Sequence, residues 1–352
     1  MKMKKVLESV LAVCLLGSML CACSQSGGGS SASSGASKAD SASSVNWPAG
    51  TVNLMVPGKA GGGSDLTTRY LSTGLNKEQG INFSVYNYDN TAVCFQNIAN
   101  QKPDGANLCV AHTAIMTQYI TGTSEVDPAK QVTVIAAIGN NGLRCIAARK
   151  DAPYNTFKEM VDYCKTHPGI VKAGMAPGGT TQFMLGKIES ECGVKFNNVQ
   201  CAEETDRLTN LAGGFIDIGS ISLSNGLEYE KAGKLKVLAT IGTDGAKIED
   251  FDAAAAQKQN YKSVQEQGYQ NVAWGTSYYL VGPAGMSQDL VEKINASLKN
   301  IASADSEYTK GMKQMGQIAE WHDVQESQKM YQEEYDSAVK VAKDLGIYSV
   351  KQ

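Results

Sequence analysis

Residues 51–78 read TVNLMVPGKAGGGSDLTTRYLSTGLNKE, and this stretch decides the fold. Thr51 to Val56 has the apolar pattern of a strand, whereas Asp65 to Glu78 has the spacing of a helix. The residues between them are rich in glycine. A strand that passes through a short loop into a helix is the first half of a β-α unit, which is typical of parallel or mixed sheets.

The same alternation continues along the chain. Further strands are expected at 82–87, 107–111, 132–138, 143–148, 170–175, 194–199, 215–221, 235–241 and 277–281. Further helices are expected at 92–100, 114–120, 157–165, 180–192, 203–211, 226–232, 288–301 and 327–345. The last helix carries apolar residues at helical spacing, which predicts a face packed on the body: Met330, Tyr331, Tyr335, Ala338 and Val341.

A second glycine loop, Ala176 to Thr181, leads from the strand at 170–175 into the helix at 180–192. Parallel sheets bind ligands at the carboxyl ends of their strands, where loops lead into helix N-termini. Glycine lets backbone N–H groups face a ligand, and the helix end adds partial positive charge. The two loops therefore predict an anion cradle that needs no basic side chain.

Polar residues that follow the glycines have two possible roles. Ser64, Asp65, Thr180 and Thr181 can cap their helices, and the hydroxyl groups can also face a ligand; for Asp65 an N-cap role is favoured. A purely structural role remains open for each loop, because glycine-rich βα turns are common. Neither loop matches a nucleotide-binding motif.

The chain begins as an exported lipoprotein would. Three lysines precede an apolar stretch of about a dozen residues. This stretch is too short to form a transmembrane helix in the mature protein but suits a signal peptide. The sequence Leu20-Cys21-Ala22-Cys23 resembles a lipobox, which predicts a signal peptide at 1–22 and an acylated Cys23. An ordinary signal peptide or a signal-anchor helix is the alternative. Residues 23–46, mostly Ser, Gly and Ala, predict a flexible tether.

Composition narrows the class of function. The formal net charge is −3 and no basic run is present, so nucleic acid is not an expected partner. After the signal, no apolar stretch approaches 18 residues, so we expect no transmembrane span. Only three histidines occur, and no catalytic, metal or cofactor motif is present. We therefore expect no enzyme activity, no metal and no cofactor.

Six cysteines remain beyond Cys23, and none has metal-ligand spacing: Cys94, Cys109, Cys145, Cys164, Cys192 and Cys201. Most lie inside apolar patterns, which favours free buried thiols. Export also permits disulfides, and Cys192 with Cys201 is the first pair to test.

Many short motifs, in this order, resemble the receptors of tripartite tricarboxylate transporters (TctC or Bug type). They are Trp47-Pro48, residues 52–57, residues 60–65 with Arg69, residues 102–108, 152–154 and 168–169, Gly174 with residues 178–180, and residues 211–217, 232–239, 274–275 and 282–286.

The resemblance implies an α/β, periplasmic-binding-protein-like (Venus flytrap) fold, with two α/β domains of mixed sheets joined by crossing hinge strands. Domain 1 would take residues 47–140 and 243–352, and domain 2 would take residues 141–242. A carboxylate would lie between the glycine loops. The implied site is Lys59, Ala60, Gly61, Gly62, Gly63, Ser64, Asp65, Gly178, Gly179, Thr180 and Thr181, with Thr113 and Ala114 more weakly.

Three features depart from the family pattern. Residues 90–93 read Asn-Thr-Ala-Val where the family often has a glycine-rich stretch. Residues 202–205 read Ala-Glu-Glu-Thr where small residues are usual. Glu203 and Glu204 would repel an anionic ligand tail, bind an ammonium group, or occupy the first turn of a helix, where negative charge is favoured. Lys59, where relatives often have a small or apolar residue, would favour acids or point to solvent.

The resulting hypothesis is a monomeric extracytoplasmic solute receptor, anchored to the cell membrane by lipid. It would bind a di-, tricarboxylate or related small organic acid and deliver it to the membrane permease subunits of a tripartite-type transporter. An ABC-type solute-binding lipoprotein for a different solute is the alternative, and a catalytic lipoprotein is a further one.

Substitution Cys23→Ala should abolish lipid labelling and release or mislocalise the protein. The domain should stay folded, because the tether separates it from the anchor. Labelling with a fatty-acid analogue and membrane fractionation test this. Unchanged labelling and equal membrane retention would refute the acylation of Cys23.

Overall fold

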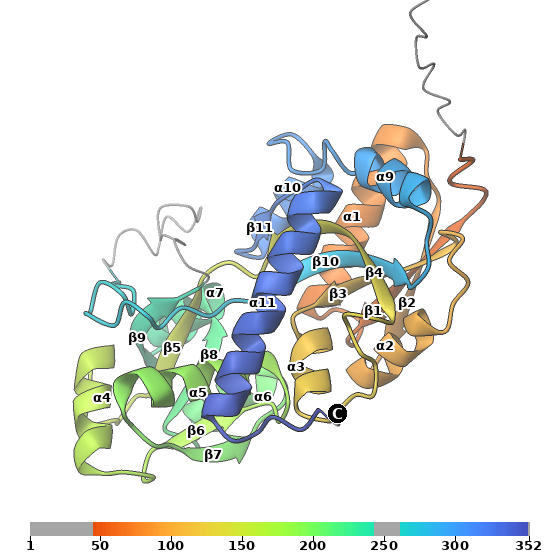
Figure 1. Cartoon of the computed structure of the whole chain (residues 1–352). Coiled ribbons are helices and arrows are strands. Elements are labelled where there is room, and N and C mark those ends of the chain that lie inside the picture. The colour runs from red at the N-terminus through yellow and green to blue at the C-terminus, as the bar shows by residue number, and fades with distance from the viewer. Residues whose placement is uncertain (1–44, 243–260, 351–352) are drawn as a thin grey trace, which may run out of the picture. The chain divides into compact units, whose positions relative to one another are not determined.

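The computed structural model describes residues 45–242 and 261–350 (Figure 1). The expected signal peptide, the acylated Cys23 and all but the last two residues of the tether lie outside the described residues. Among the helices that the structure describes, none has the combination of length and hydrophobicity required to cross a membrane.

The first sheet has the strand order β11-β4-β10-β3-β1-β2. Its strands are β1 (Val52–Pro57), β2 (Phe83–Tyr88), β3 (Asn107–His112), β4 (Val132–Asn140), β10 (Ser277–Pro283) and β11 (Ile318–Ala319). Strand β1 pairs in parallel with β2 and β3, whereas β10 runs antiparallel to both β3 and β4. The sheet is therefore mixed.

The second sheet has the order β7-β6-β8-β5-β9. Its strands are β5 (Arg144–Arg149), β6 (Lys172–Met175), β7 (Asn197–Gln200), β8 (Ile218–Ser222) and β9 (Leu235–Ile241). Strand β6 is parallel to β7 and β8, and β5 is antiparallel to β8 and β9. Two mixed sheets with covering helices confirm the expected α/β fold class.

Helices alternate with these strands as the sequence predicts. They are α1 (Gly63–Gln79), α2 (Thr91–Ala99), α3 (Ala114–Ile120), α4 (Phe157–Thr166), α5 (Thr180–Cys192), α6 (Glu204–Ala212), α7 (Leu223–Lys231), α9 (Gln288–Ser297), α10 (Glu307–Gln314) and α11 (Val324–Asp344).

The structure differs from the sequence-based expectations in two additional elements and in several boundaries; α7 and α11, for example, begin three residues earlier than expected. Helix α10 and strand β11 were not expected: α10 has a glycine in its middle, and β11 has only two residues. Strands β6, β7 and β8 begin two to three residues later than expected. Ile170 and Phe215 have the apolar character of strand residues, but 60% and 69% of their surfaces are exposed.

Among the described residues, two segments that connect the sheets contact each other. Asn141 follows β4 and Thr276 precedes β10. The backbone N–H of Asn141 donates to the carbonyl of Thr276 at 2.8 Å, and the N–H of Thr276 donates to Oδ1 of Asn141 at 3.1 Å. The two connecting segments are therefore joined to each other by the hydrogen bonds between Asn141 and Thr276.

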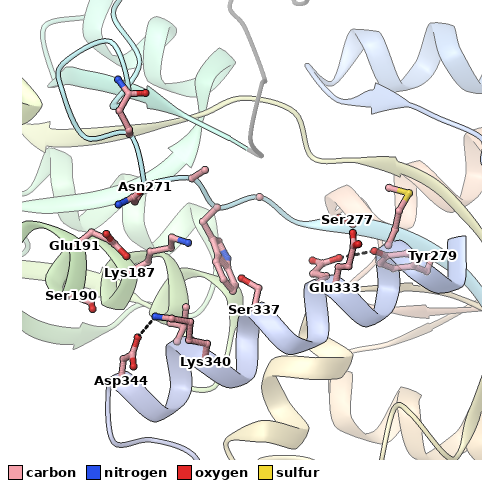
Figure 2. A pocket seen from close by; sticks show the side chains of 17 residues that line it. Lys187, Ser190, Glu191, Asn271, Ser277, Tyr279, Glu333, Ser337, Lys340 and Asp344 are labelled. Atoms are coloured by element: carbon pink, nitrogen blue, oxygen red, sulfur yellow. Dashed lines mark hydrogen bonds and ion pairs between the residues drawn. The ribbon is translucent and has the colours of Figure 1, made fainter. Parts of the chain in front are cut away.

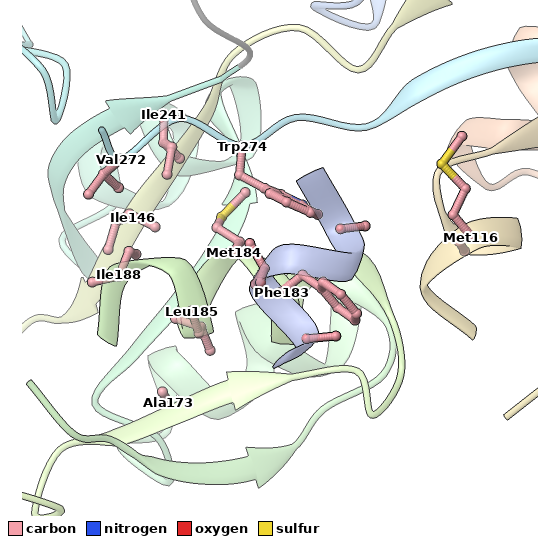
Figure 3. Close-up of a cluster of buried hydrophobic side chains, with 14 of the residues drawn as sticks. Met116, Ile146, Ala173, Phe183, Met184, Leu185, Ile188, Ile241, Val272 and Trp274 are labelled. Carbon is pink, nitrogen blue, oxygen red and sulfur yellow. The ribbon is translucent and has the colours of Figure 1, made fainter. Parts of the chain in front are cut away.

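A continuous hydrophobic core joins the two sheets. Helix α11 contacts β4 and α3 next to the first sheet and α5 next to the second (Figure 1). Its expected apolar face is confirmed: Tyr331, Ala338 and Val341 are buried. Phe183 of α5 stacks on Trp274 with ring centroids 5.7 Å apart (Figure 3).

All six cysteines of the described domain are free and buried, as favoured from the sequence. Cys192 and Cys201 therefore do not form the disulfide that was singled out for testing. Burial raises the thiol pKa of Cys164 to about 12 and of Cys192 to about 11. These thiols are therefore protonated and unreactive near neutral pH.

The contact between α1 and α10 depends on Gly311. A Cβ atom at Gly311 would lie 2.2 Å from Cγ of Tyr70, so the helices meet at this glycine. Substitution Gly311→Ala should lower the free energy of unfolding by about 1–3 kcal/mol, because overpacking outweighs the gain in helix propensity. Denaturant unfolding measures this change.

Gly74→Ala in α1 is the matched control. A Cβ there would lie 3.6 Å from its nearest neighbour, an ordinary contact. This variant should be neutral or more stable by up to about 1 kcal/mol. Equal stabilisation by both substitutions would contradict the α1–α10 packing.

Candidate ligand-binding site

The first glycine loop presents unpaired backbone donors. Gly62 is the N-cap of α1 in an extended conformation, and no side chain caps the helix. The N–H of Gly62 donates to the carbonyl of Lys59 at 3.1 Å, and the first intrahelical bond runs from Leu66 to Gly62. The three amides between them, at residues 63–65, have no acceptor among the described residues.

Asp65 shapes this loop. Its Oδ2 accepts hydrogen bonds from the N–H of Gly61 at 2.8 Å and from Nε of Arg69 at 3.0 Å. Burial opposes ionisation, but the hydrogen bonds from Arg69 and Gly61 outweigh it and lower the pKa of Asp65. Asp65 therefore has a local structural role, but the favoured N-cap position was wrong, because Gly62 is the N-cap and Asp65 is the third helical residue.

The second glycine loop repeats this arrangement at α5. Gly179 is an extended N-cap without a side-chain cap, so the expected capping by Thr180 and Thr181 was also wrong. Gly178 has a positive φ of 68°, which favours glycine, and its N–H donates to Oε1 of Gln182 at 2.7 Å. Oγ1 of Thr181 accepts from the N–H of Ala176 at 2.8 Å. The amides of Thr180 and Thr181 have no acceptor among the described residues.

The remaining expected site residues are those of the two glycine loops and, separately, Thr113 and Ala114. Residues 59–63 are exposed, Ser64 is partly buried, and Gly178 is packed under Thr121 and Thr123. Thr113 is fully buried; its hydroxyl donates to Oε1 of Glu334 and accepts from the N–H of Ser277.

Ala114 is also buried, and its N–H donates to Nδ1 of His112 at 3.2 Å. Thr113 and Ala114 therefore have their polar groups engaged within the protein. They are less available to a ligand than the two loops.

His112 connects the end of β3 to the first loop. Because Nδ1 accepts from Ala114, the ring proton is on Nε2, which lies 3.4 Å from the carbonyl of Pro57 and donates to it. Burial lowers the pKa of His112 to about 4. The ring is therefore neutral near pH 7 and fixes the start of the loop.

Tyr278 and Gln317 lie beneath the first loop, and sequence analysis did not identify them. Nε2 of Gln317 donates to the Tyr278 hydroxyl at 3.1 Å, and its Oε1 accepts from the Thr67 hydroxyl at 2.8 Å. A Cβ at Gly63 would lie 3.4 Å from Nε2 of Gln317 and 3.7 Å from the Tyr278 hydroxyl. No sequence motif marks these residues, because they come from segments more than 200 positions away.

Glu203 and Glu204 occupy the start of α6, in agreement with the helix-turn interpretation. Glu203 is the N-cap and forms a capping box with Asp206. Glu204 pairs with Arg144 at 2.6 Å and accepts from Ser222 and Asn225. Burial opposes its charge, but Arg144 and these hydrogen bonds lower the pKa of Glu204 to about 2.

A further cavity lies away from the two glycine loops. It has a volume of about 760 Å³ and is lined by residues of α5, α11 and the segment before β10 (Figure 2). Its lining includes Lys187 and Lys340 together with four carboxylates, Glu191, Glu333, Glu334 and Asp344. This excess of negative charge disfavours an acid, and neither glycine loop contributes to the lining.

Within residues 45–242 and 261–350, no group of three or more His, Cys, Asp or Glu side chains is placed to hold a metal ion.

Comparisons with known proteins agree with this architecture. The family model of the tripartite tricarboxylate transporter family receptors (TctC) matches residues 68–347. The match includes the second glycine loop and begins three positions after Asp65. A UPF0065 protein of Agrobacterium vitis is 24% identical over 258 residues, 72% of each chain. A UPF0065 protein of Bordetella pertussis is 22% identical over 273 residues, covering 76% of this chain and 80% of its own.

Solved structures share the fold. An R. palustris protein solved with adipate has a TM-score of 0.73 and 20% identity, with 86% of this chain and 99% of that chain covered. MatC from Rhodopseudomonas palustris with bound malate has a TM-score of 0.68 and 20% identity, with 84% and 99% covered. The architecture is thus that of the two-domain periplasmic receptors, and the chain belongs to the TctC family of tripartite tricarboxylate transporter receptors.

Proposed function

We propose that this receptor binds a di-, tricarboxylate or related small organic acid between its two glycine loops and delivers it to the membrane permease subunits of a tripartite-type transporter. The domains that close on the acid would be residues 47–140 with 243–352, and residues 141–242. The observation that carries the proposal is the pair of uncapped helices, α1 and α5, whose first amides have no acceptor among the described residues.

Two physical effects favour an anion at these helix ends. The first N–H groups of a helix have no intrahelical acceptor, and the helix dipole places partial positive charge there. A hydrogen bond to a charged group contributes about 1.5–3 kcal/mol. A few such bonds, together with Ser and Thr hydroxyls and bridging waters, are consistent with micromolar affinity, about −8 kcal/mol.

The comparisons support the acid class without identifying the acid. Two structures that share this fold contain adipate and malate. We further propose a monomeric, extracytoplasmic receptor anchored through Cys23, with Lys59 at the exposed rim of the first loop.

An acid that binds should stabilise the protein. At a hundredfold excess over the dissociation constant, binding adds about 2.7 kcal/mol, which corresponds to a rise in Tm of about 5–10 °C. A thermal-shift panel of di- and tricarboxylates, aromatic acids, amino acids and sugars tests this. Hits should lie among the acids, and stabilisation by neutral sugars alone would refute the proposal.

Proline substitutions at the first helical positions remove single N–H donors. Gly63→Pro and Thr180→Pro fit the fold, because proline is favoured at this position and the preceding glycines are extended. Each variant should weaken binding of the best acid by about 10- to 100-fold, the equivalent of one charge-assisted hydrogen bond. Isothermal titration measures the change.

Gly63→Ala and Thr180→Ala are the matched controls, because each keeps the backbone N–H. Space exists at Gly63, where the nearest atom to an added Cβ is 3.4 Å away. Both alanine variants should bind the acid with a dissociation constant within about threefold of that of the parent protein. This range includes the loss of one hydroxyl at Thr180. Folded proline variants that bind as well as their alanine controls would show that these amides do not hold the acid.

Closure of the two domains on the acid should make the molecule more compact. An acid that contacts both loops binds the closed state better, and only such differential affinity shifts a conformational equilibrium. Small-angle X-ray scattering should give a smaller radius of gyration with saturating acid. Superimposable curves at proven saturation would contradict hinge closure.

A further inference from the structure

Two arginines meet at one carbonyl on the second sheet. The carbonyl oxygen of Ser220 accepts from Nη2 of Arg144 at 3.2 Å and from Nε of Arg207 at 2.8 Å. Arg144 also donates from Nε to the Ser220 hydroxyl at 3.1 Å. Two guanidinium groups that share an acceptor repel each other, so this arrangement requires a compensating negative charge.

Glu204 is hydrogen-bonded to only one of the two arginines. Its carboxylate is fully engaged by Arg144, Ser222 and Asn225. Arg207 is 5% exposed and donates to neutral carbonyls alone, those of Ser220, Cys201 and Ala202. Buried arginines are ordinarily paired with a carboxylate. Arg207 therefore has no carboxylate in direct contact among the described residues, and the charges of Glu204 and Glu203 act on it without a hydrogen bond.

This cluster lies at the same edge of the sheet as the second glycine loop. The N–H of Cys201 donates to the carbonyl of Met175, the residue that precedes this loop. A Cβ at Gly174 would lie 3.4 Å from Cγ of Arg207. The cluster thus borders the carboxyl ends of β6, β7 and β8, where a ligand of a parallel sheet binds.

The charges of this cluster also act on Tyr278, a residue beneath the first glycine loop. Burial raises the pKa of the Tyr278 hydroxyl most strongly, and the nearby charges of Arg144 and Glu204 also act on it. Tyr278 lies directly beneath Gly63. The charge of Arg144 therefore acts on a group that supports the first cradle.

We propose that Arg144 and Arg207 bind the second anionic group of the ligand, so that the receptor selects dicarboxylates over monocarboxylates of the same length. This inference rests on the proposed function. Nη1 of Arg144 and Nη2 of Arg207 donate to no acceptor in the part of the chain that the structure describes. Planar guanidinium groups with free donors are suited to binding a carboxylate. Glu204 sets the orientation of Arg144 and is a positioning residue.

Isothermal titration with matched acids tests the proposal. Straight-chain dicarboxylates of four to eight carbons are each compared with the monocarboxylate of equal carbon number. The parent protein should bind at least one dicarboxylate tenfold or more tightly than its matched monocarboxylate. In Arg144→Gln/Glu204→Gln, which keeps the net charge, that preference should fall below threefold, while monocarboxylate affinity changes by less than threefold.

Arg144→Lys is a second variant that keeps both the charge and the pairing with Glu204. It should also reduce the preference at least threefold, because lysine lacks the planar fork. A purely structural role would lower the stability of these variants without changing the ratio of affinities. A parent protein that binds both members of every pair equally, or folded variants that keep the full preference, would overturn this inference alone. Failure of every acid to bind the parent would overturn the proposed function as well.

Discussion

The first amides of an α-helix need acceptors that the helix cannot supply, and this requirement organises the molecule. Most helices here obtain an acceptor from their own N-cap residue. In α4, α9, α10 and α11, for example, the side chain of a Thr, Ser or Asp N-cap accepts a hydrogen bond from a backbone N–H of the first turn. Helices α1 and α5 begin with glycine instead. Their amides are left for an acceptor from outside the chain, and each helix follows a parallel strand that directs its N-terminus to the carboxyl edge of a sheet.

The rest of the structure holds these two helix ends in place. Asp65 and His112 fix the first loop from either side, and Thr181 fixes the second through Ala176. The connecting segments are joined by the Asn141–Thr276 hydrogen bonds, and α11 contacts elements next to both sheets. Backbone cradles recognise charge but carry little information about the remainder of a ligand. The arginine cluster on the second sheet supplies that missing selectivity in the account proposed here.

The sequence predicted local features well and long-range ones poorly. Alternating patterns located nearly every strand and helix, and the glycine loops were identified because their residues are contiguous. Helix α10 was missed because Gly311 packs against Tyr70, a contact with a residue far away in the sequence. The cluster of Arg144, Arg207 and Glu204 was missed for the same reason. Arg144 is on β5, whereas Glu204 and Arg207 are on α6, and only the folded sheet brings both arginines to the carbonyl of Ser220 on β8. The sequence singled out Glu204 but not its ion-pair partner, Arg144.

A crystal structure with a bound dicarboxylate tests the central claim most directly. The account predicts carboxylate oxygens within about 3 Å of the amide nitrogens at the N-termini of α1 and α5. An acid bound in the cavity beside α11, with those amides left to solvent, would contradict it.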